Sequence, residues 1–181
     1  MSDQKPVRII EVVPHDSRWA GEYLKEAELI RRVFGEQLVE IYHIGSTAIP
    51  GIYAKPIIDF LVGVKDIQQV DSFNPQMEQL GYLAYGEFGI SGRRYFPKGP
   101  VLRTHQVHIF QSGDAQIARH LNFRDYMHAH PAEAKQYEAL KIDLAQRFRF
   151  DIDGYTDGKD DFIQEMDRRA AEWVKRGRVE G

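Results

Sequence analysis

Apolar residues in the first part of the chain follow two spacings, one typical of helices and one typical of strands. Between residues 19 and 34 they recur every three or four positions, which predicts an amphipathic helix that ends near Gly35. Residues 39–44 favour a strand. Residues 56–64, PIIDFLVGV, are almost wholly apolar and rich in β-branched side chains, which predicts a strand covered on both faces.

The remainder of the chain changes from mixed to mainly helical. Residues 66–80 have helical character, interrupted at Asn74-Pro75 and ended by Gly81. Strands followed by a helical last third predict a small α/β or α+β sheet with a helical C-terminal region. The further elements that we predict are short strands at residues 82–85, 93–96 and 101–110 and helices at residues 115–130, 131–150 and 159–176.

Length and composition agree with one globular domain. The chain has 181 residues, of which 43% are hydrophobic and 28% charged, so it can bury a core of ordinary size without disulfides or a structural metal. No internal repeat, low-complexity linker or long charge block marks a boundary. We therefore expect a single domain over residues 1–181.

Charge and cysteine content exclude several classes of function. The 24 Lys and Arg against 27 Asp and Glu leave a net charge of −3, so no bulk binding to nucleic acid or to membrane surfaces is expected. The absence of cysteine excludes disulfides, thiolate metal sites and thiol catalysis. Because no apolar run approaches the roughly 20 residues that span a bilayer, we expect a soluble cytoplasmic protein.

The segment from His43 to Asp59 carries the strongest chemical signal. A predicted strand ends in Gly45-Ser46-Thr47, and the next, apolar strand carries Asp59. Glycine allows the backbone to approach a phosphate closely, hydroxyl and amide groups donate to it, and a carboxylate can hold a bridging cation. A simple turn and helix cap is the alternative for Gly45-Ser46-Thr47. Asp59 among apolar neighbours is costly, however, unless something pairs with it.

These segments, with others further along, resemble the GrpB family of predicted nucleotidyltransferases. The resemblance covers residues 7–173 and implies a fold of the polymerase β type, in which a small mixed sheet carries Gly-Ser on one element and acidic residues on the next strands. Related domains fused to dephospho-CoA kinases hint at CoA or nucleotide metabolism. The resemblance rests on HIGSTAIPGIYAKPIID at residues 43–59, Arg94-Tyr95-Phe96, His105-Gln106-Val107-His108, LNFRDY at residues 121–126, Tyr137, Leu140-Lys141, Tyr155 and Lys159.

One strand departs from the pattern of active transferases. Two-metal phosphoryl transfer uses carboxylates two positions apart on one strand, whereas here Asp59 is followed at the second position by Leu61. The later strand offers His105 and His108, whose opposite parity brings at most one of them to the Asp59 side. His108 could act as a base or hold a transition metal with Asp59, or could only be bonded within the sheet. For His105 a structural or exposed position is the stronger interpretation.

Four cationic residues coincide with the family motifs, namely Lys55, Arg94, Arg124 and Lys141. They could clamp phosphates by charge-assisted hydrogen bonds. For any one of them alone a surface salt bridge is the better interpretation, whereas together they favour an anion-binding cleft.

We therefore expect a nucleotidyltransferase-family protein that binds a nucleotide, such as a nucleoside triphosphate, or a phosphorylated small molecule, with catalysis retained, altered or lost. Gly45, Ser46 and Thr47 would bind phosphate, and Asp59, assisted by His108, would hold a divalent cation such as Mg²⁺ or Mn²⁺. The alternative is a non-catalytic ligand- or partner-binding module of the same fold, which the missing second carboxylate favours.

Overall fold

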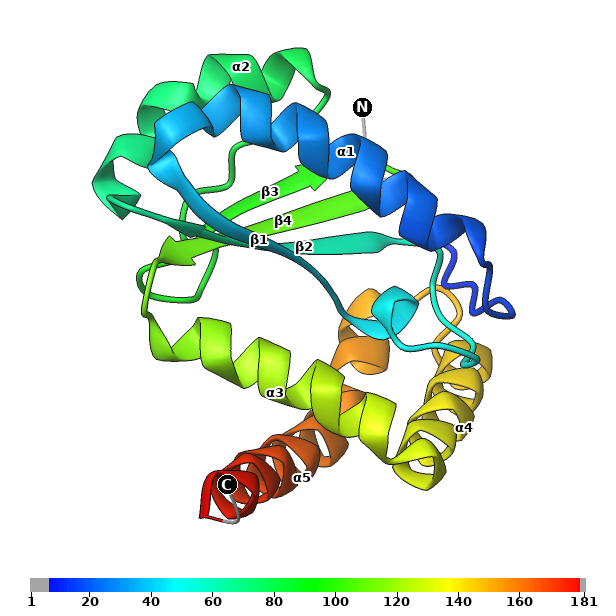
Figure 1. Ribbon diagram of the computed structural model, residues 1–181. Helices are drawn as coiled ribbons and strands as arrows, with labels where there is room; N and C mark the ends of the chain where they lie inside the picture. Colours follow the sequence, from blue (N-terminus) through cyan, green and yellow to red (C-terminus); the bar gives the residue numbers. More distant parts are fainter. Residues whose placement is uncertain (1–6, 180–181) are drawn as a thin grey trace.

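A four-stranded mixed sheet forms the centre of the computed structural model, which describes residues 7–179. The strand order is β1-β2-β4-β3, with β2 and β4 parallel and the outer pairs antiparallel. In Figure 1, α1 and α2 cover one face of this sheet, while α3, α4 and α5 lie on the other side. The strands are β1 (Leu38–Ile44), β2 (Ile58–Val64), β3 (Arg94–Lys98) and β4 (His105–Gln111), and the α-helices are α1 (Arg18–Phe34), α2 (Asn74–Gln79), α3 (Ala115–Ala129), α4 (Pro131–Arg147) and α5 (Ile152–Val179).

The face under α1 is the main hydrophobic core. The predicted apolar stripe of α1 places Ala27, Ile30 and Phe34 against the sheet. Phe60 and Val62 of β2 meet them there and are fully buried. The helix ends at Gly35, whose positive φ of 51° ends the helical path, as the sequence predicts.

The opposite face of the sheet carries both a smaller apolar cluster and polar side chains. Side chains alternate along a strand, so the residues next to Phe60 point the other way. Leu61 packs there with Ile44, Phe110 and Ile117 of α3. Asp59 lies on this same face, and the helical C-terminal region therefore faces the predicted site.

Several elements differ from the sequence prediction. Strand β4 begins at His105 rather than at residue 101, and α4 ends at Arg147 rather than at residue 150. Helix α5 begins at Ile152 rather than at Lys159, and it includes Gly154 and Gly158. A Cβ atom at Gly158 would collide with the Leu144 side chain of α4, so tight helix packing outweighs the low helix propensity of glycine. Residues 82–85 run beside β3 with only one isolated bridge, Tyr82 to Lys98, instead of forming a named strand.

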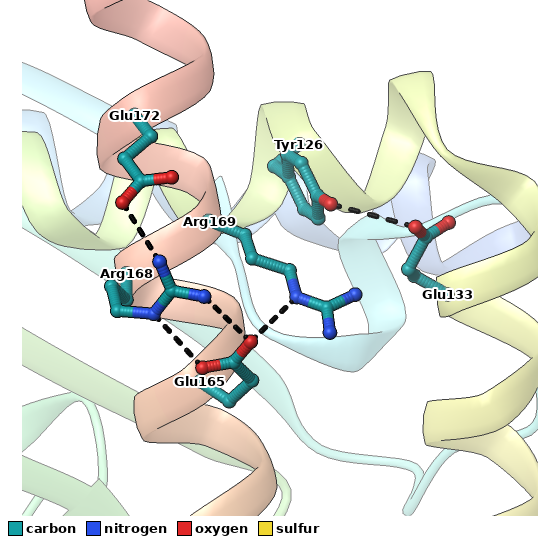
Figure 2. A network of polar contacts seen from close by, with 6 residues as sticks. All are labelled: Tyr126, Glu133, Glu165, Arg168, Arg169 and Glu172. Carbon is teal, nitrogen blue, oxygen red and sulfur yellow. Dashed lines mark hydrogen bonds and ion pairs between the residues drawn. The ribbon is translucent and has the colours of Figure 1, made fainter.

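The exposed face of the C-terminal half of α5 carries a group of ion pairs within the helix. We call Glu165, Arg168, Arg169 and Glu172 the α5 ion-pair network (Figure 2). Arg168 contacts Glu165 at 2.8 Å and Glu172 at 2.7 Å. Close by, the Tyr126 hydroxyl of α3 donates to Glu133 of α4 at 3.5 Å (Figure 2). Among residues 7–179, no helix is long and apolar enough to cross a membrane.

Candidate functional site

The predicted Gly-Ser turn and Asp59 do come together. Ile44, the last residue of β1, pairs with Asp59 of β2, so Gly45 lies beside the carboxylate. Gly45 has a φ of 74°, and a Cβ atom there would stand 2.7 Å from Asp59 Oδ2. Both the backbone angle and this close approach require glycine. Across the sheet, His108 Nε2 lies 3.2 Å from Asp59 Oδ1, so His108 is the histidine that reaches the Asp59 side.

A cavity of about 170 Å³ opens at this point, and we call it the lysine cavity. It contains three lysines from three different segments: Lys55 lies before β2, Lys141 on α4 and Lys159 on α5. The turn after β1 and strand β2 supply Ser46, Thr47 and Asp59, whereas helices α4 and α5 supply two of the three lysines. The other lining residues are Gly45, Ser46, Thr47, Ile57, Asp59, Gln106, Tyr137 and Tyr155.

Burial makes these lysines electrostatically unusual. Lys141 is only 1% exposed, and its Nζ donates to the Tyr53 carbonyl at 2.6 Å. Burial, followed by repulsion from Lys159, lowers the pKa of Lys141 to about 7. Burial and the charge of Lys55 lower the pKa of Lys159 to about 8, and burial also lowers the pKa of Lys55.

No carboxylate of the described residues lies within 4.0 Å of the three ammonium groups, although Asp59 lines the same cavity. Within residues 7–179, the ion pairs shorter than 4.0 Å involve other cations, such as Lys98 with Glu26 and Lys135 with Glu138. Two tyrosine rings lie under the lysines instead: Lys159 and Lys55 stand 4.4 and 5.0 Å from the centre of Tyr155, and Lys141 stands 4.5 Å from that of Tyr137. The site therefore holds positive charge with donors available to an anion.

The other predicted cations lie elsewhere. Arg94 points to the α1 side of the sheet, where its Nε donates to Asp71 at 2.8 Å. Arg124 of α3 donates to Asp125 and to the carbonyl of His43. Neither lines the lysine cavity, so each forms the local contacts that a salt-bridge interpretation expects.

Two further candidates have structural partners. The Thr47 hydroxyl donates to the Ile57 carbonyl at 3.2 Å and lies 2.9 Å from His43 Nε2, although Thr47 lines the cavity. Burial lowers the pKa of His43 to about 4, so this ring is neutral near pH 7. His105 lies on the opposite face from Asp59, with its ring against Phe60.

The donor set for a cation is small. Leu61 has no exposed surface and lies beside His108 in the sheet register, so it supplies apolar packing where active transferases have a carboxylate. Residues 7–179 contain no group of three or more His, Asp or Glu side chains arranged to hold a metal. Asp59 and His108 together offer one carboxylate and one imidazole, a pair that suits a cation completed by oxygens of a bound phosphate.

Some lining residues were not among the predicted site residues. Gln106, Tyr137, Tyr155 and Lys159 all lie in family-like motifs, which was the available signal. Lys159 stands at the first residue of the helix that the sequence predicts, so the sequence does not indicate which way its side chain points. The earlier start of α5 instead fixes Lys159 in a regular turn beside α4.

A second cavity of about 850 Å³ adjoins the first, and we call it the large cavity. Both are lined by Lys55, Ile57, Gln106 and Lys159, so these four residues form their common boundary. Apolar side chains including Phe88 and Leu102 line part of the remainder. Charged and polar side chains line the rest, namely Arg8, Glu11, Arg93, Arg103, His108, Asp153, Thr156 and Asp157.

Comparison with known proteins gives consistent matches. The family model described as GrpB protein matches residues 9–169. The UPF0157 protein YqkA of Bacillus subtilis is 46% identical over 170 residues, which cover 94% of this chain but only 50% of that protein. A dephospho-CoA kinase of Mycolicibacterium paratuberculosis is 28% identical over 194 residues, covering 93% of this chain and 47% of that protein. The chain thus spans about half the length of each of these two relatives.

Two solved structures are also similar. The crystal structure of GrpB from Enterococcus faecalis has a TM-score of 0.88 and 43% identity, over 91% of this chain and 99% of that one. A cytoplasmic RNA terminal U-transferase has a TM-score of 0.50 and 12% identity, over 78% of this chain and 41% of that one, a likeness of fold alone. The expected mixed sheet with C-terminal helices and a nucleotidyltransferase-like fold is confirmed. The chain belongs to the GrpB family.

Proposed function

We propose that this protein binds the phosphate groups of a nucleotide or of another phosphorylated small molecule in the lysine cavity. The observation that carries the proposal is the set of three lysines, drawn from three segments, around about 170 Å³ that they share with a single carboxylate, Asp59; none of the three forms an ion pair within 4.0 Å among residues 7–179. Buried and half-buried charges that lack a close ion-pair partner lower the stability of a fold. A bound polyanion neutralises Lys55, Lys141 and Lys159 together and removes that cost.

Each remaining part of the cavity has a role in this proposal. Gly45 lets the backbone of the turn pass close beside the Asp59 carboxylate, and Ser46 offers a hydroxyl donor to the ligand's phosphate. Asp59, with His108 at 3.2 Å, binds a divalent cation whose other ligands are phosphate oxygens. The protein supplies only one carboxylate and one imidazole to the cation. Mg²⁺ should therefore bind weakly before the phosphorylated molecule arrives, and Mn²⁺ should bind better.

A binding module fits the site better than an ordinary two-metal transferase. Leu61 belongs to a packed apolar cluster with Ile44 and Phe110, so the second metal has no carboxylate on this strand. Nucleotidyl transfer through one cation and His108 as base is the second candidate, favoured by the Asp59–His108 contact. The relationship to a dephospho-CoA kinase supports CoA precursors as ligands to test beside nucleotides.

A ligand screen by thermal unfolding tests the binding proposal. The four ribonucleoside triphosphates, CoA and dephospho-CoA should be compared with and without Mg²⁺ or Mn²⁺. A ligand at a hundredfold excess over its Kd adds about 2.7 kcal/mol to the free energy of unfolding. We expect at least one phosphorylated ligand to raise the melting temperature and Ser46→Ala to reduce that rise. If millimolar concentrations of all six leave it unchanged, the proposal is wrong.

Release of pyrophosphate separates the two candidates. A binding module releases none from any nucleoside triphosphate. Turnover that disappears in Asp59→Asn, while the melting temperature of that variant stays near wild type, would establish the enzyme instead. Leu61→Asp should not create activity, because it places a charge at a position with no exposed surface and costs about 3 kcal/mol or more.

A further inference from the structure

The large cavity has an aromatic wall beside the site of the proposed phosphates. Phe88 stacks on Tyr95 with ring centres 5.3 Å apart and an angle of 23° between the planes. Tyr95 in turn lies 5.4 Å from the ring of His108, the partner of Asp59. Three neighbouring rings that line the large cavity, Phe88, Tyr95 and His108, therefore lead to the Asp59 carboxylate.

The backbone of Phe88 is held in an unfavourable conformation. Its φ is 46°, and it is the one non-glycine residue with a positive φ among residues 7–179. Its side chain is nevertheless 61% exposed, so burial of the ring does not account for the strain. Strained residues that present an exposed side chain at a cavity are typical of ligand-binding sites.

Two arginines support this wall. Arg93 donates to the carbonyls of Glu87 and Phe88, which fixes the strained turn, and it lies 4.9 Å above the Tyr95 ring. Arg103 donates through Nη2 to the Tyr85 hydroxyl, while its Nε and Nη1 are buried without a hydrogen-bond partner. Buried unpaired donors are costly, and an acceptor on a ligand in this cavity would pair with them.

We infer that the ligand carries a flat aromatic group, such as a nucleobase, which stacks on Phe88 while its phosphates occupy the lysine cavity. The inference rests on the proposed function, because the two cavities share Lys55 and Lys159 and one extended molecule can occupy both. Arg103 then pairs with a carbonyl oxygen or ring nitrogen of the aromatic group.

Calorimetric titration with two kinds of ligand of equal phosphate length, one without and one with a nucleoside, tests this inference. Sodium tripolyphosphate probes the lysine cavity alone, and ATP, GTP, CTP and UTP probe both cavities. We expect at least one nucleotide to bind more tightly than tripolyphosphate. Phe88→Gly should raise the Kd of that nucleotide about tenfold without changing the Kd of tripolyphosphate. This variant should remain folded, because Phe88 is exposed and glycine suits its φ.

Two controls make the result specific. Phe88→Tyr keeps a stacking ring and should bind the nucleotide as wild type does. Phe150→Ala removes another phenylalanine, 63% exposed and outside both cavities, and should change neither Kd. If tripolyphosphate binds but Phe88→Gly weakens no nucleotide, the aromatic inference is wrong while the proposed function stands. If neither tripolyphosphate nor any nucleotide binds, both are wrong.

Discussion

Helix α5 uses its basic residues in two different ways. In its C-terminal half, Arg168 and Arg169 are exposed and each pairs with Glu165 at 2.7 to 2.8 Å (Figure 2). In its N-terminal half, Lys159 faces Lys55 in the lysine cavity and has no close carboxylate partner within residues 7–179. The arginines of the C-terminal half are paired within the helix, whereas the Lys159 charge in the N-terminal half is available to a ligand.

The difference separates charges that are paired within the protein from charges that are available to a ligand. An exposed pair at helical spacing contributes little to folding and is screened by salt. A lysine cluster with pKa values lowered by burial opposes folding and is favourable only with an anion present. The account therefore predicts opposite outcomes for matched substitutions in the two regions.

The largest effect is expected from removing two cations at the cavity. Lys55→Met with Lys159→Met should weaken tripolyphosphate binding by about a hundredfold or more, because each charge-assisted hydrogen bond contributes about 1.5–3 kcal/mol. Calorimetric titration measures the loss. The matched control, Arg168→Met with Arg169→Met, removes two cations from the same helix and should leave the Kd unchanged. Equal losses of affinity in both double variants would indicate a nonspecific charge effect and would contradict a different role for the two regions.

A second substitution separates ligand binding from stability. Lys141→Met keeps the apolar stem of a residue that is 1% exposed and removes its charge. We expect the free protein to be as stable as wild type or more stable by about 1 kcal/mol in urea unfolding, because a buried charge is replaced by packing. Affinity for tripolyphosphate should fall about tenfold. A large loss of stability would mean that the bond to the Tyr53 carbonyl is what Lys141 provides.

The pH dependence follows from the same lysines. Their folded-state pKa values, about 7 for Lys141 and about 8 for Lys159, lie below the ordinary 10.5, so the unfolded chain binds more protons between these limits. These two lysines therefore lower the free energy of unfolding of the free protein most below pH 7, and this destabilisation decreases as pH rises toward 10. Tripolyphosphate affinity should fall severalfold from pH 7 to 9. A flat profile in wild type would contradict the lowered pKa values.

The smallest effect is expected at the α5 ion-pair network. Arg168→Ala should leave the urea midpoint and the Kd of tripolyphosphate unchanged, since Arg168 is exposed and its pairs with Glu165 and Glu172 are at the surface. Raising the salt concentration should likewise leave the stability difference between variant and wild type near zero. A marked destabilisation would show that this network holds α5 in place.

Much of the fold could be predicted from periodicity because one strong pattern decided each element. The α1 stripe and the apolar β2 strand are of this kind, and both are observed. The start of α5 could not be predicted, because Gly154 and Gly158 disfavour a helix locally and only the contact of Gly158 with Leu144 shows why they are there.

The site was predictable where residues are joined through neighbouring strands. Gly45, Asp59 and His108 are brought together by strand pairing, and strand parity correctly separated His108 from His105. The positions of cationic side chains on other elements were harder to predict, because a motif does not reveal the face on which a side chain lies. Arg94 points to Asp71 on the far face, whereas Lys159, from a helix that starts earlier than expected, completes the lysine cavity.

Proton uptake on binding tests the central claim most directly. Tripolyphosphate should be titrated at pH 8 into wild type and Lys141→Met, in buffers of different ionisation enthalpy. At this pH the Lys141 ammonium, with a pKa of about 7, is largely deprotonated in the free protein and is protonated when the anion binds. Wild type should therefore take up about one proton more than Lys141→Met. Equal uptake by the two proteins, or no binding to wild type, would contradict an anion site built from buried lysines.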